Sequence, residues 1–180
     1  MKFEELVTKR LKLRKLSPEV IKYVFENLST DDLKKFFCFN NEEELNKEKE
    51  KLEKGLSTFN RTFLYFQLID RLSNDVIGWC GYHTWYIDHD RAEIGYVLTN
   101  ENYKRKGIMS EAIKPIIKYG FHQMKLNRIE ALVSPNNIAS LNIIKKQNFV
   151  QEGYLKQHYK INNKLEDSLF FALLKSEYKK

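Results

Sequence analysis

The sequence predicts an α+β fold in which a mixed, mostly antiparallel, twisted sheet is flanked by helices. Three observations support this class. β-rich runs separated by short polar turns occupy the middle of the chain, an amphipathic helical stretch follows them, and a strand, a helix and a hairpin pattern complete the C-terminal part. The length of 180 residues predicts a single domain over residues 1–180, large enough to bury a full core.

The first half of the chain is assigned from alternation and helix caps. Leu11 and Leu13 alternate with basic residues, which is typical of a strand. Ser17 before Pro18 is typical of a helix start, because serine caps a helix and proline fits its first turn. The predicted order is a strand at 8–15, a helix at 17–27, a short helix from 29, an exposed helix at 41–54 and strands at 63–69, 76–87 and 91–98.

The second half contains the longest predicted helix, because apolar residues between Met109 and Met124 recur every three or four positions. Pro115 lies inside this helix, where it removes a hydrogen bond and costs about 3 kcal/mol, so we expect a kink near Ile113 or an early interruption. The remaining predictions are a strand at 128–133, a helix at 137–147 and strands at 149–159 and 167–174 around the turn at 162–163.

A basic, glycine-containing turn precedes this long helix. The first N–H groups of a helix have no internal partner and lie at the positive end of its dipole. Lys104, Arg105 and Lys106 add positive charge, and Gly107 lets a ligand approach without a Cβ in the way. The turn therefore predicts a phosphate site, with a solvated helix cap as the alternative.

Composition limits the function classes. The chain is 42% hydrophobic and 31% charged, and no run approaches the roughly 18 apolar residues of a membrane span. Residues 1–5 lack an apolar signal core, which predicts a cytoplasmic location. Cys38 and Cys80 have no C-x-x-C spacing and are expected to be free thiols. The net charge of +7 favours an anionic ligand, but the charges are dispersed, which argues against nucleic acid.

Several segments together resemble the GNAT superfamily of N-acetyltransferases, over nearly the whole chain and in order. Lys104 stands where arginine or glutamine is usual, Met109 replaces glycine or alanine, and Asn148 replaces a glycine that ends a helix. Asparagine tolerates the left-handed conformation that such an end needs. The segments that carry the resemblance are 104–109 after strand 92–98, 134–140, 146–149, 152–153, and 8–14, which is similar to ribosomal-protein-alanine N-acetyltransferases.

The resemblance implies acetyl-CoA as cosubstrate and no metal. The backbone of Val97, Leu98 and Thr99 would pair with the pantetheine arm. Asn137 would hydrogen-bond the pantetheine, with a helix N-cap as its alternative role. Lys146 would lie near the nucleotide phosphates. The pyrophosphate would be held around the turn formed by Lys104, Arg105, Lys106, Gly107, Ile108, Met109 and Ser110.

The implied reaction is direct attack of an amine on the thioester, because no nucleophilic side chain has a suitable base nearby in the sequence. Alternation places Glu93 on one strand face with Gly95 and Val97, and the resemblance makes it the base, acting through a water. Its alternative is a solvent-facing strand residue. Ser140 lies one helical turn after Asn137 and is the candidate that protonates the departing sulfur, with a core or cap role as the alternative.

The acceptor is predicted only as a class. Freeing an N-terminal amine at pH 7 costs roughly 1.4 kcal/mol and freeing a lysine-like amine about 4.6 kcal/mol, which favours a protein or peptide N-terminal α-amine. Small amines such as polyamines or antibiotics are the alternative, and a non-catalytic basic module that binds RNA or CoA is the rival from another class. We expect His83 and Trp85, on one strand face, to line the acceptor pocket, and the terminal hairpin to allow a homodimer.

Overall fold

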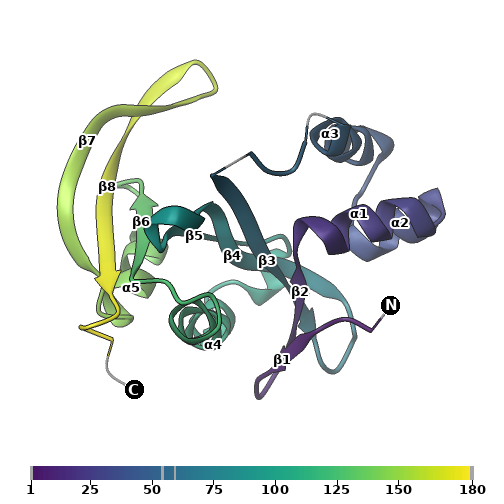
Figure 1. The fold of residues 1–180 in the computed structure, drawn as a ribbon, viewed down its shortest axis with the longest axis horizontal. Coiled ribbons are helices and arrows are strands. Elements are labelled where there is room, and N and C mark those ends of the chain that lie inside the picture. The colour runs from purple at the N-terminus through teal and green to yellow at the C-terminus, as the bar shows by residue number, and fades with distance from the viewer. Residues whose placement is uncertain (1, 54, 59, 179–180) are drawn as a thin grey trace.

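The computed structural model describes residues 2–53, 55–58 and 60–178. The first residue of the segment 1–5 and the last residue of the predicted helix 41–54, Met1 and Lys54, therefore lie outside the described residues. It is an α+β fold, as predicted (Figure 1). The elements are β1 (Glu5–Val7), β2 (Leu11–Leu16), α1 (Pro18–Asn27), α2 (Thr30–Phe37), α3 (Glu42–Glu53), β3 (Arg61–Asp70), β4 (Val76–Tyr86), η1 (Ile87–His89), β5 (Arg91–Leu98), η2 (Glu101–Tyr103), α4 (Ile108–His122), β6 (Arg128–Val133), α5 (Ile138–Lys146), β7 (Val150–Ile161) and β8 (Lys164–Leu174).

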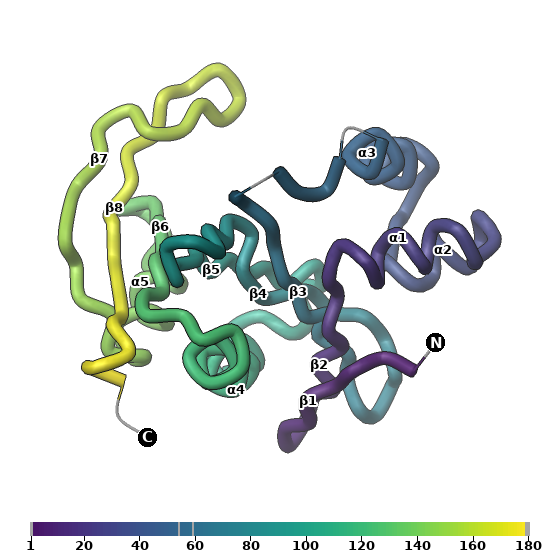
Figure 2. Tube along the Cα trace, viewed as in Figure 1, coloured from purple at the N-terminus to yellow at the C-terminus, as the bar shows by residue number. Residues whose placement is uncertain are grey.

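The strands form one eight-stranded sheet in the order β1-β2-β3-β4-β5-β6-β8-β7. The pairing of β5 with β6 is parallel, and the other neighbouring pairs are antiparallel. The sheet is therefore mixed and mostly antiparallel, as the sequence predicts. The C-terminal hairpin of β7 and β8 arches away from the rest of the sheet (Figure 2), and its tip turn at Asn162 and Asn163 has positive φ at both residues.

Helices cover the two faces of the sheet differently. α4 and α5 lie on one face, while α1, α2 and α3 gather over the β2–β3 end of the other face (Figure 1). The α4 face holds the main hydrophobic core, and Tyr82 of β4 donates a buried hydrogen bond of 2.8 Å to the carbonyl of Ile116. The other face is left open over β4, β5 and β6, and this opening positions the site.

The helix starts follow their predicted caps, since the Ser17 and Ser29 side chains accept backbone hydrogen bonds from Val20 and Asp32. Two expectations need correction. Strand β1 is missing from the sequence-based assignment because three mixed residues carry no periodic signal. The early interruption at Pro115 is wrong, since α4 continues through it over fifteen residues, held by a face of buried side chains that offsets the lost hydrogen bond.

The start of α4 is fixed to the β1–β2 connection through Glu111. Its carboxylate accepts hydrogen bonds from the Thr8 hydroxyl at 2.6 Å and from the backbone N–H and Nε of Arg10, both at 2.7 Å. Burial alone would raise the pKa of Glu111, but these hydrogen bonds outweigh it and hold the pKa below its ordinary value. Arg10 also donates to the Lys106 carbonyl at 3.0 Å, so one cluster holds both the helix start and the preceding turn.

We expect Glu111→Gln to lower the free energy of unfolding by about 1–2 kcal/mol at neutral pH, because the charge-assisted hydrogen bonds are lost. The pKa of Glu111 is lowered by folding, so its contribution is complete above its ordinary pKa and disappears as the pH falls through the folded value. Urea unfolding between about pH 7 and pH 3.5 should show that the free energies of unfolding of the wild type and Glu111→Gln become equal as the pH falls. Glu43→Gln, which breaks an exposed pair with Lys47, is the matched control; a pH-independent gap would contradict this role of Glu111.

Candidate active site

The site begins where β5 and β6 separate. These strands pair only from Arg91 to Glu93 on β5 and from Arg128 to Glu130 on β6, although both continue beyond these residues. The following residues of the two strands therefore have unpaired edges that face each other across a wedge.

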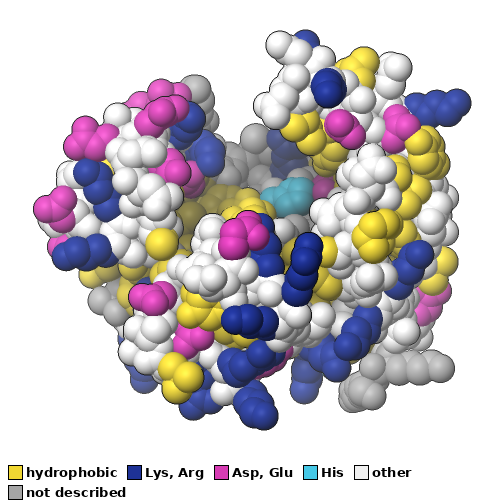
Figure 3. Space-filling view, turned by 180° about the vertical axis from the view of Figure 1, so that it is seen from behind, with side chains coloured by type: hydrophobic (Ala, Val, Ile, Leu, Met, Phe, Trp, Pro, Cys, Tyr) yellow, Lys and Arg dark blue, Asp and Glu magenta, His cyan; other side chains and the backbone are white. Residues whose placement is uncertain are grey.

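A cavity of about 370 Å³ occupies this wedge. The hairpin side contributes Tyr159 and Ile161, so the cavity lies between the hairpin and the sheet. Figure 3 shows this side of the molecule hollowed between two raised lobes, with hydrophobic and histidine side chains at the floor. The other lining residues are Trp79, His83, Glu93, Ile94, Gly95, Tyr96, Ala131, Leu132, Val133, Ser134, Asn137 and Ser140.

The open edge of β5 presents backbone groups at alternate residues. The Thr99 N–H donates to the Ile77 carbonyl of β4 at 3.0 Å, so Thr99 and, by alternation, Val97 direct their hydrogen-bonding groups toward β4. Leu98 and Tyr96 direct theirs toward the wedge. Of the predicted residues Val97, Leu98 and Thr99, only Leu98 directs its backbone groups toward the wedge, and an extended chain lying there would pair with Leu98 and Tyr96.

Glu93 lies at the inner end of the cavity, on the face opposite α4. Its side chain is 15% exposed, and its Oε1 lies 3.3 Å from Nε2 of His83. Gly95, two residues along β5, makes room for this histidine: a Cβ there would approach Cδ2 of His83 to 2.6 Å. The structure therefore brings the predicted residues Glu93 and His83 together, with the imidazole held over a glycine.

Trp85 does not lie with His83, and this expectation is wrong. A register shift between Tyr82 and Thr84 inserts an extra residue into β4 and reverses its alternation. Trp85 stands opposite the fully buried Ala92 and packs against the α4 core instead of lining the cavity. The tryptophan that lines this cavity is Trp79.

The turn before α4 has the backbone form expected of a helix-terminus anion site. Gly107 caps α4 with φ of 72°, and within the described part of the chain no side-chain cap bond is made, so the N–H groups of Ile108, Met109 and Ser110 point out of the helix end. Arg105 also has a positive φ of 60°. A Cβ at Gly107 would meet only the Arg10 guanidinium at 3.8 Å, so glycine is required there by the left-handed backbone.

The start of helix α5 lines the cavity, whereas its last residue, Lys146, lines a separate pocket. Asn137 is the N-cap and accepts a hydrogen bond of 3.0 Å from the Ser140 N–H, which is the alternative role that its position predicts. The Tyr96 hydroxyl lies 3.4 Å from the Ser140 carbonyl, and burial raises the pKa of Tyr96 to about 12. Measured from Asn137 along the helix axis, at 1.5 Å per residue, Lys146 lies roughly 13 Å away. It lines a pocket together with Lys114.

Three lining residues were missed at the level of sequence. Alternation along β5 places Tyr96 on the face opposite Glu93, so the sequence predicts no site role for it. In the structure its hydroxyl faces α5 at the edge of the wedge. Tyr159 comes from the hairpin, and Trp79 lies in the apolar first half of β4, where no neighbouring polar residue marks a site. Only the tertiary fold brings these three aromatic residues to the cavity.

Two negative findings apply to the described residues. Among residues 2–53, 55–58 and 60–178, no group of three or more His, Cys, Asp or Glu side chains is arranged to hold a metal ion. Over the same residues, no helix has the length and apolar character needed to cross a membrane. Within that part of the chain both cysteines are free thiols, as predicted, with Cys38 exposed and Cys80 buried.

Comparison with known proteins agrees with this geometry. Residues 10–150 match the family model described as acetyltransferase (GNAT) domain. The chain is 34% identical over 177 residues to "Uncharacterized N-acetyltransferase p20" of Bacillus licheniformis, covering 97% of this chain and 98% of that protein. The crystal structure of an acetyltransferase (GNAT family) from Bacillus anthracis superposes with a TM-score of 0.68 at 30% identity, covering 97% and 100% of the two chains.

More distant relatives carry names for different acceptors. The [ribosomal protein uS5]-alanine N-acetyltransferase of Escherichia coli K12 is 28% identical over 110 residues, covering 61% of this chain and 56% of that protein. The spermidine N(1)-acetyltransferase of the same strain is 28% identical over 90 residues, covering 50% and 48%. The chain therefore belongs to the GNAT family and is an N-acetyltransferase, while the identity of its acceptor amine is a separate question.

We expect Gly95→Ala to impair activity much more than stability. The added methyl group displaces the His83 ring, which can rotate, and breaks its contact with Glu93. kcat/KM should fall about 10- to 100-fold, because His83 contacts the carboxylate expected to act as the base, while Tm changes little. Gly153→Ala is the control, since its Cβ makes only an ordinary 3.7 Å contact with Phe170. If Gly95→Ala had the same kcat/KM as the wild type, the position of the His83 ring would have no role in activity.

Proposed function

We propose that this enzyme transfers the acetyl group of acetyl-CoA by direct attack of a primary amine, with a protein or peptide N-terminal α-amine as the preferred acceptor. The observation that carries the proposal is the Glu93 carboxylate, largely buried at the inner end of a wedge whose other wall is an unpaired strand edge. In this proposal Glu93 is the proton acceptor, beside the position that an extended thioester arm would occupy.

The cosubstrate has three sets of partners in this proposal. Its pantetheine arm pairs with the open backbone groups of Tyr96 and Leu98. Its pyrophosphate is held by the uncapped N–H groups at the start of α4, with the basic side chains of residues 104–106 around it. Lys146 serves as an outer contact for the nucleotide phosphates, away from the cavity itself.

The chemistry requires a neutral amine, a stabilised oxyanion and a protonated leaving thiolate. Glu93 accepts the amine proton through a water. A backbone N–H of the open β5 edge near Leu98, one that the arm leaves free, donates to the oxyanion as the thioester carbon becomes tetrahedral. When the C–S bond breaks, the Ser140 hydroxyl protonates or hydrogen-bonds the sulfur.

The acceptor preference rests on the proton that must be removed. A single carboxylate acting through water suits an N-terminal amine, whose deprotonation at pH 7 costs about 1.4 kcal/mol against about 4.6 kcal/mol for a lysine-like amine. The relative named for ribosomal-protein alanine supports this choice, and the relative named for spermidine supports a small polyamine as the alternative.

A cytoplasmic location and a homodimer complete the proposal. The hairpin of β7 and β8 ends the sheet and exposes Val150, Ile161 and Leu165, each more than half accessible to solvent. An exposed edge strand with apolar side chains favours pairing with another chain. Pairing with a second copy of this chain is the proposed use of that surface.

We expect Glu93→Gln to lower kcat/KM for an α-amine acceptor about 100-fold or more at neutral pH. The loss should shrink above the amine pKa, because the amine then reaches the site already deprotonated. Thiol release measured across pH tests this, and calorimetry should give wild-type affinity for acetyl-CoA.

The control for Glu93→Gln is Glu26→Gln, which removes one negative charge from the exposed surface of α1. An equal loss at every pH would mean that Glu93 has a structural role. Accumulation of a stable acetyl-enzyme after mixing with acetyl-CoA alone would contradict the direct route.

A further inference from the structure

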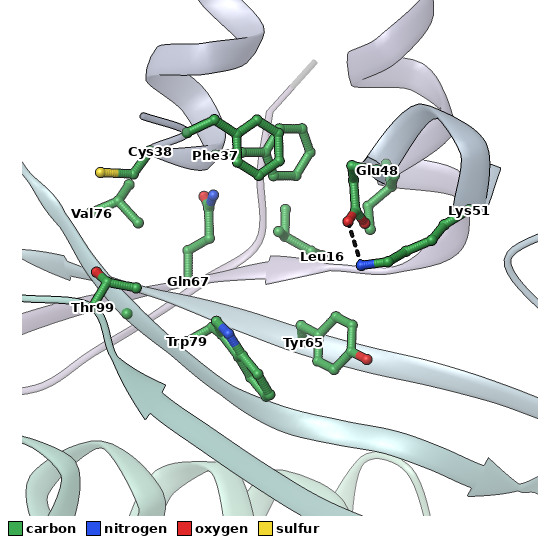
Figure 4. A pocket seen from close by; sticks show the side chains of 13 residues that line it. Leu16, Phe37, Cys38, Glu48, Lys51, Tyr65, Gln67, Val76, Trp79 and Thr99 are labelled. Carbon is green, nitrogen blue, oxygen red and sulfur yellow. Dashed lines mark hydrogen bonds and ion pairs between the residues drawn. The ribbon is translucent and has the colours of Figure 1, made fainter. Parts of the chain in front are cut away.

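A second cavity, of about 240 Å³, lies between α2, α3 and the open face of β3 and β4. Its floor is formed by Tyr65, Gln67 and Trp79, and its roof by the aromatic residues at the end of α2 (Figure 4). Drug-sized ligands usually occupy about 300 Å³ or more, so this space suits a group of the size of one residue. The cavity lies outside the wedge described above.

The floor of this cavity contains a buried hydrogen-bond acceptor without a partner. Gln67 is only 4% exposed, and its Nε2 donates to the Phe36 carbonyl at 2.7 Å. That carbonyl can only accept, so the amide orientation is fixed, and Oε1 has no partner among the residues that the structure describes. In Figure 4 the Gln67 amide rises from β3 into the space below Phe37. Leaving such an atom unpaired is costly, which points to a ligand that donates to it.

The rest of the lining is mainly apolar and aromatic. Glu48 is the only carboxylate among the lining residues, and it pairs with Lys51 at 2.8 Å. Burial and the charge of Glu48 raise the pKa of Tyr65 to about 12, so its phenol is neutral. A polyamine carries further cations that need free carboxylates, and this cavity offers none that is uncommitted.

Trp79 forms a wall shared by this cavity and the catalytic wedge, because it lines both. On the wedge side the indole approaches Gly95, since a Cβ built there would lie 3.6 Å from Cη2. His83 lies at the same point, 3.3 Å from Glu93. A molecule with its amine at Glu93 would enter the space under α2 if its body passed the Trp79 indole.

We propose that this cavity selects the acceptor: it receives the apolar side chain of an amino-acid amide or peptide N-terminal residue, and Gln67 Oε1 accepts a hydrogen bond from the amide N–H that follows. The inference rests on the proposed function, and it adds the part of the acceptor beyond its amine. Gln67 acts as a specificity-determining residue that touches the acceptor without taking part in proton transfer.

The test compares two amines that differ by one group. Leucinamide carries an isobutyl group and an amide donor, and 3-methylbutylamine lacks only the carboxamide. In the wild type leucinamide should be preferred by kcat/KM, and Gln67→Met should reduce the ratio between the two about tenfold. Differences in amine pKa are the same for both enzymes and cancel in this comparison. Gln147→Met is the control, since it removes another glutamine with an unpaired amide atom, at the end of α5.

A second measurement uses the wild-type protein and follows chemical modification of a cysteine, so it requires neither catalytic turnover nor a folded variant. Cys38 is exposed at the edge of this cavity, whereas Cys80 is fully buried, so maleimide modification of the folded protein reports on Cys38. Leucinamide should slow the modification, and spermidine at the same concentration should leave it unchanged.

The outcomes separate the two claims. Absence of acetyl-CoA binding and of acetyl transfer to any amine would overturn the proposed function. Acetyl transfer with spermidine preferred over leucinamide, an unchanged ratio in a folded and active Gln67→Met, or no protection of Cys38 by leucinamide would overturn the selecting role of the cavity and leave the enzymatic function standing.

Discussion

The site depends on the early separation of β5 from β6. Parallel strands in a sheet normally continue their pairing, but here it stops after three residue pairs, at Glu93 and Glu130. The separation leaves the Leu98 and Tyr96 backbone groups unpaired. An open strand edge can add an extended chain through main-chain hydrogen bonds, so the wedge is suited to an extended ligand that completes the hydrogen bonding.

An ion-pair cluster holds the closed end of the wedge. Glu130 is 8% exposed and is paired with Arg91 at 2.7 Å and with Arg128 at 2.8 Å, while Arg128 also contacts Glu152 on β7. The hydrogen bond with Glu152, against the opposing effect of burial, raises the pKa of Arg128 above its usual value. Because both arginines are committed to Glu130, they neutralise the carboxylate that stands beside Glu93 in the sheet. Glu93 itself contacts His83.

Much of the fold follows from local sequence signals, and the failures are equally local. Caps at Ser17 and Ser29, the turn at Asn162 and Asn163, and the left-handed Asn148 are all encoded by residue types with one strong conformational preference. The reversed position of Trp85 was not predictable, because a bulge changes alternation without changing composition.

The candidate site divides in the same way. The alternation of β5 predicts the face of Glu93, and the basic turn before α4 predicts the uncapped helix start. Gln67 and Tyr159 carry no such signal, because a glutamine in a β-rich run and a tyrosine in a hairpin have chemical roles only through distant neighbours. Residues that bind a ligand through tertiary contacts need the fold before they can be identified.

The central claim is that the wedge and the start of α4 together form one binding site for CoA. The most direct test is a crystal structure of this enzyme with CoA. We predict that the pyrophosphate contacts the N–H groups of residues 108–110, that the arm pairs with Leu98 and Tyr96, and that the thiol lies in the cavity beside Glu93. A structure with the arm outside the wedge, or with the pyrophosphate away from the α4 start, would contradict this account.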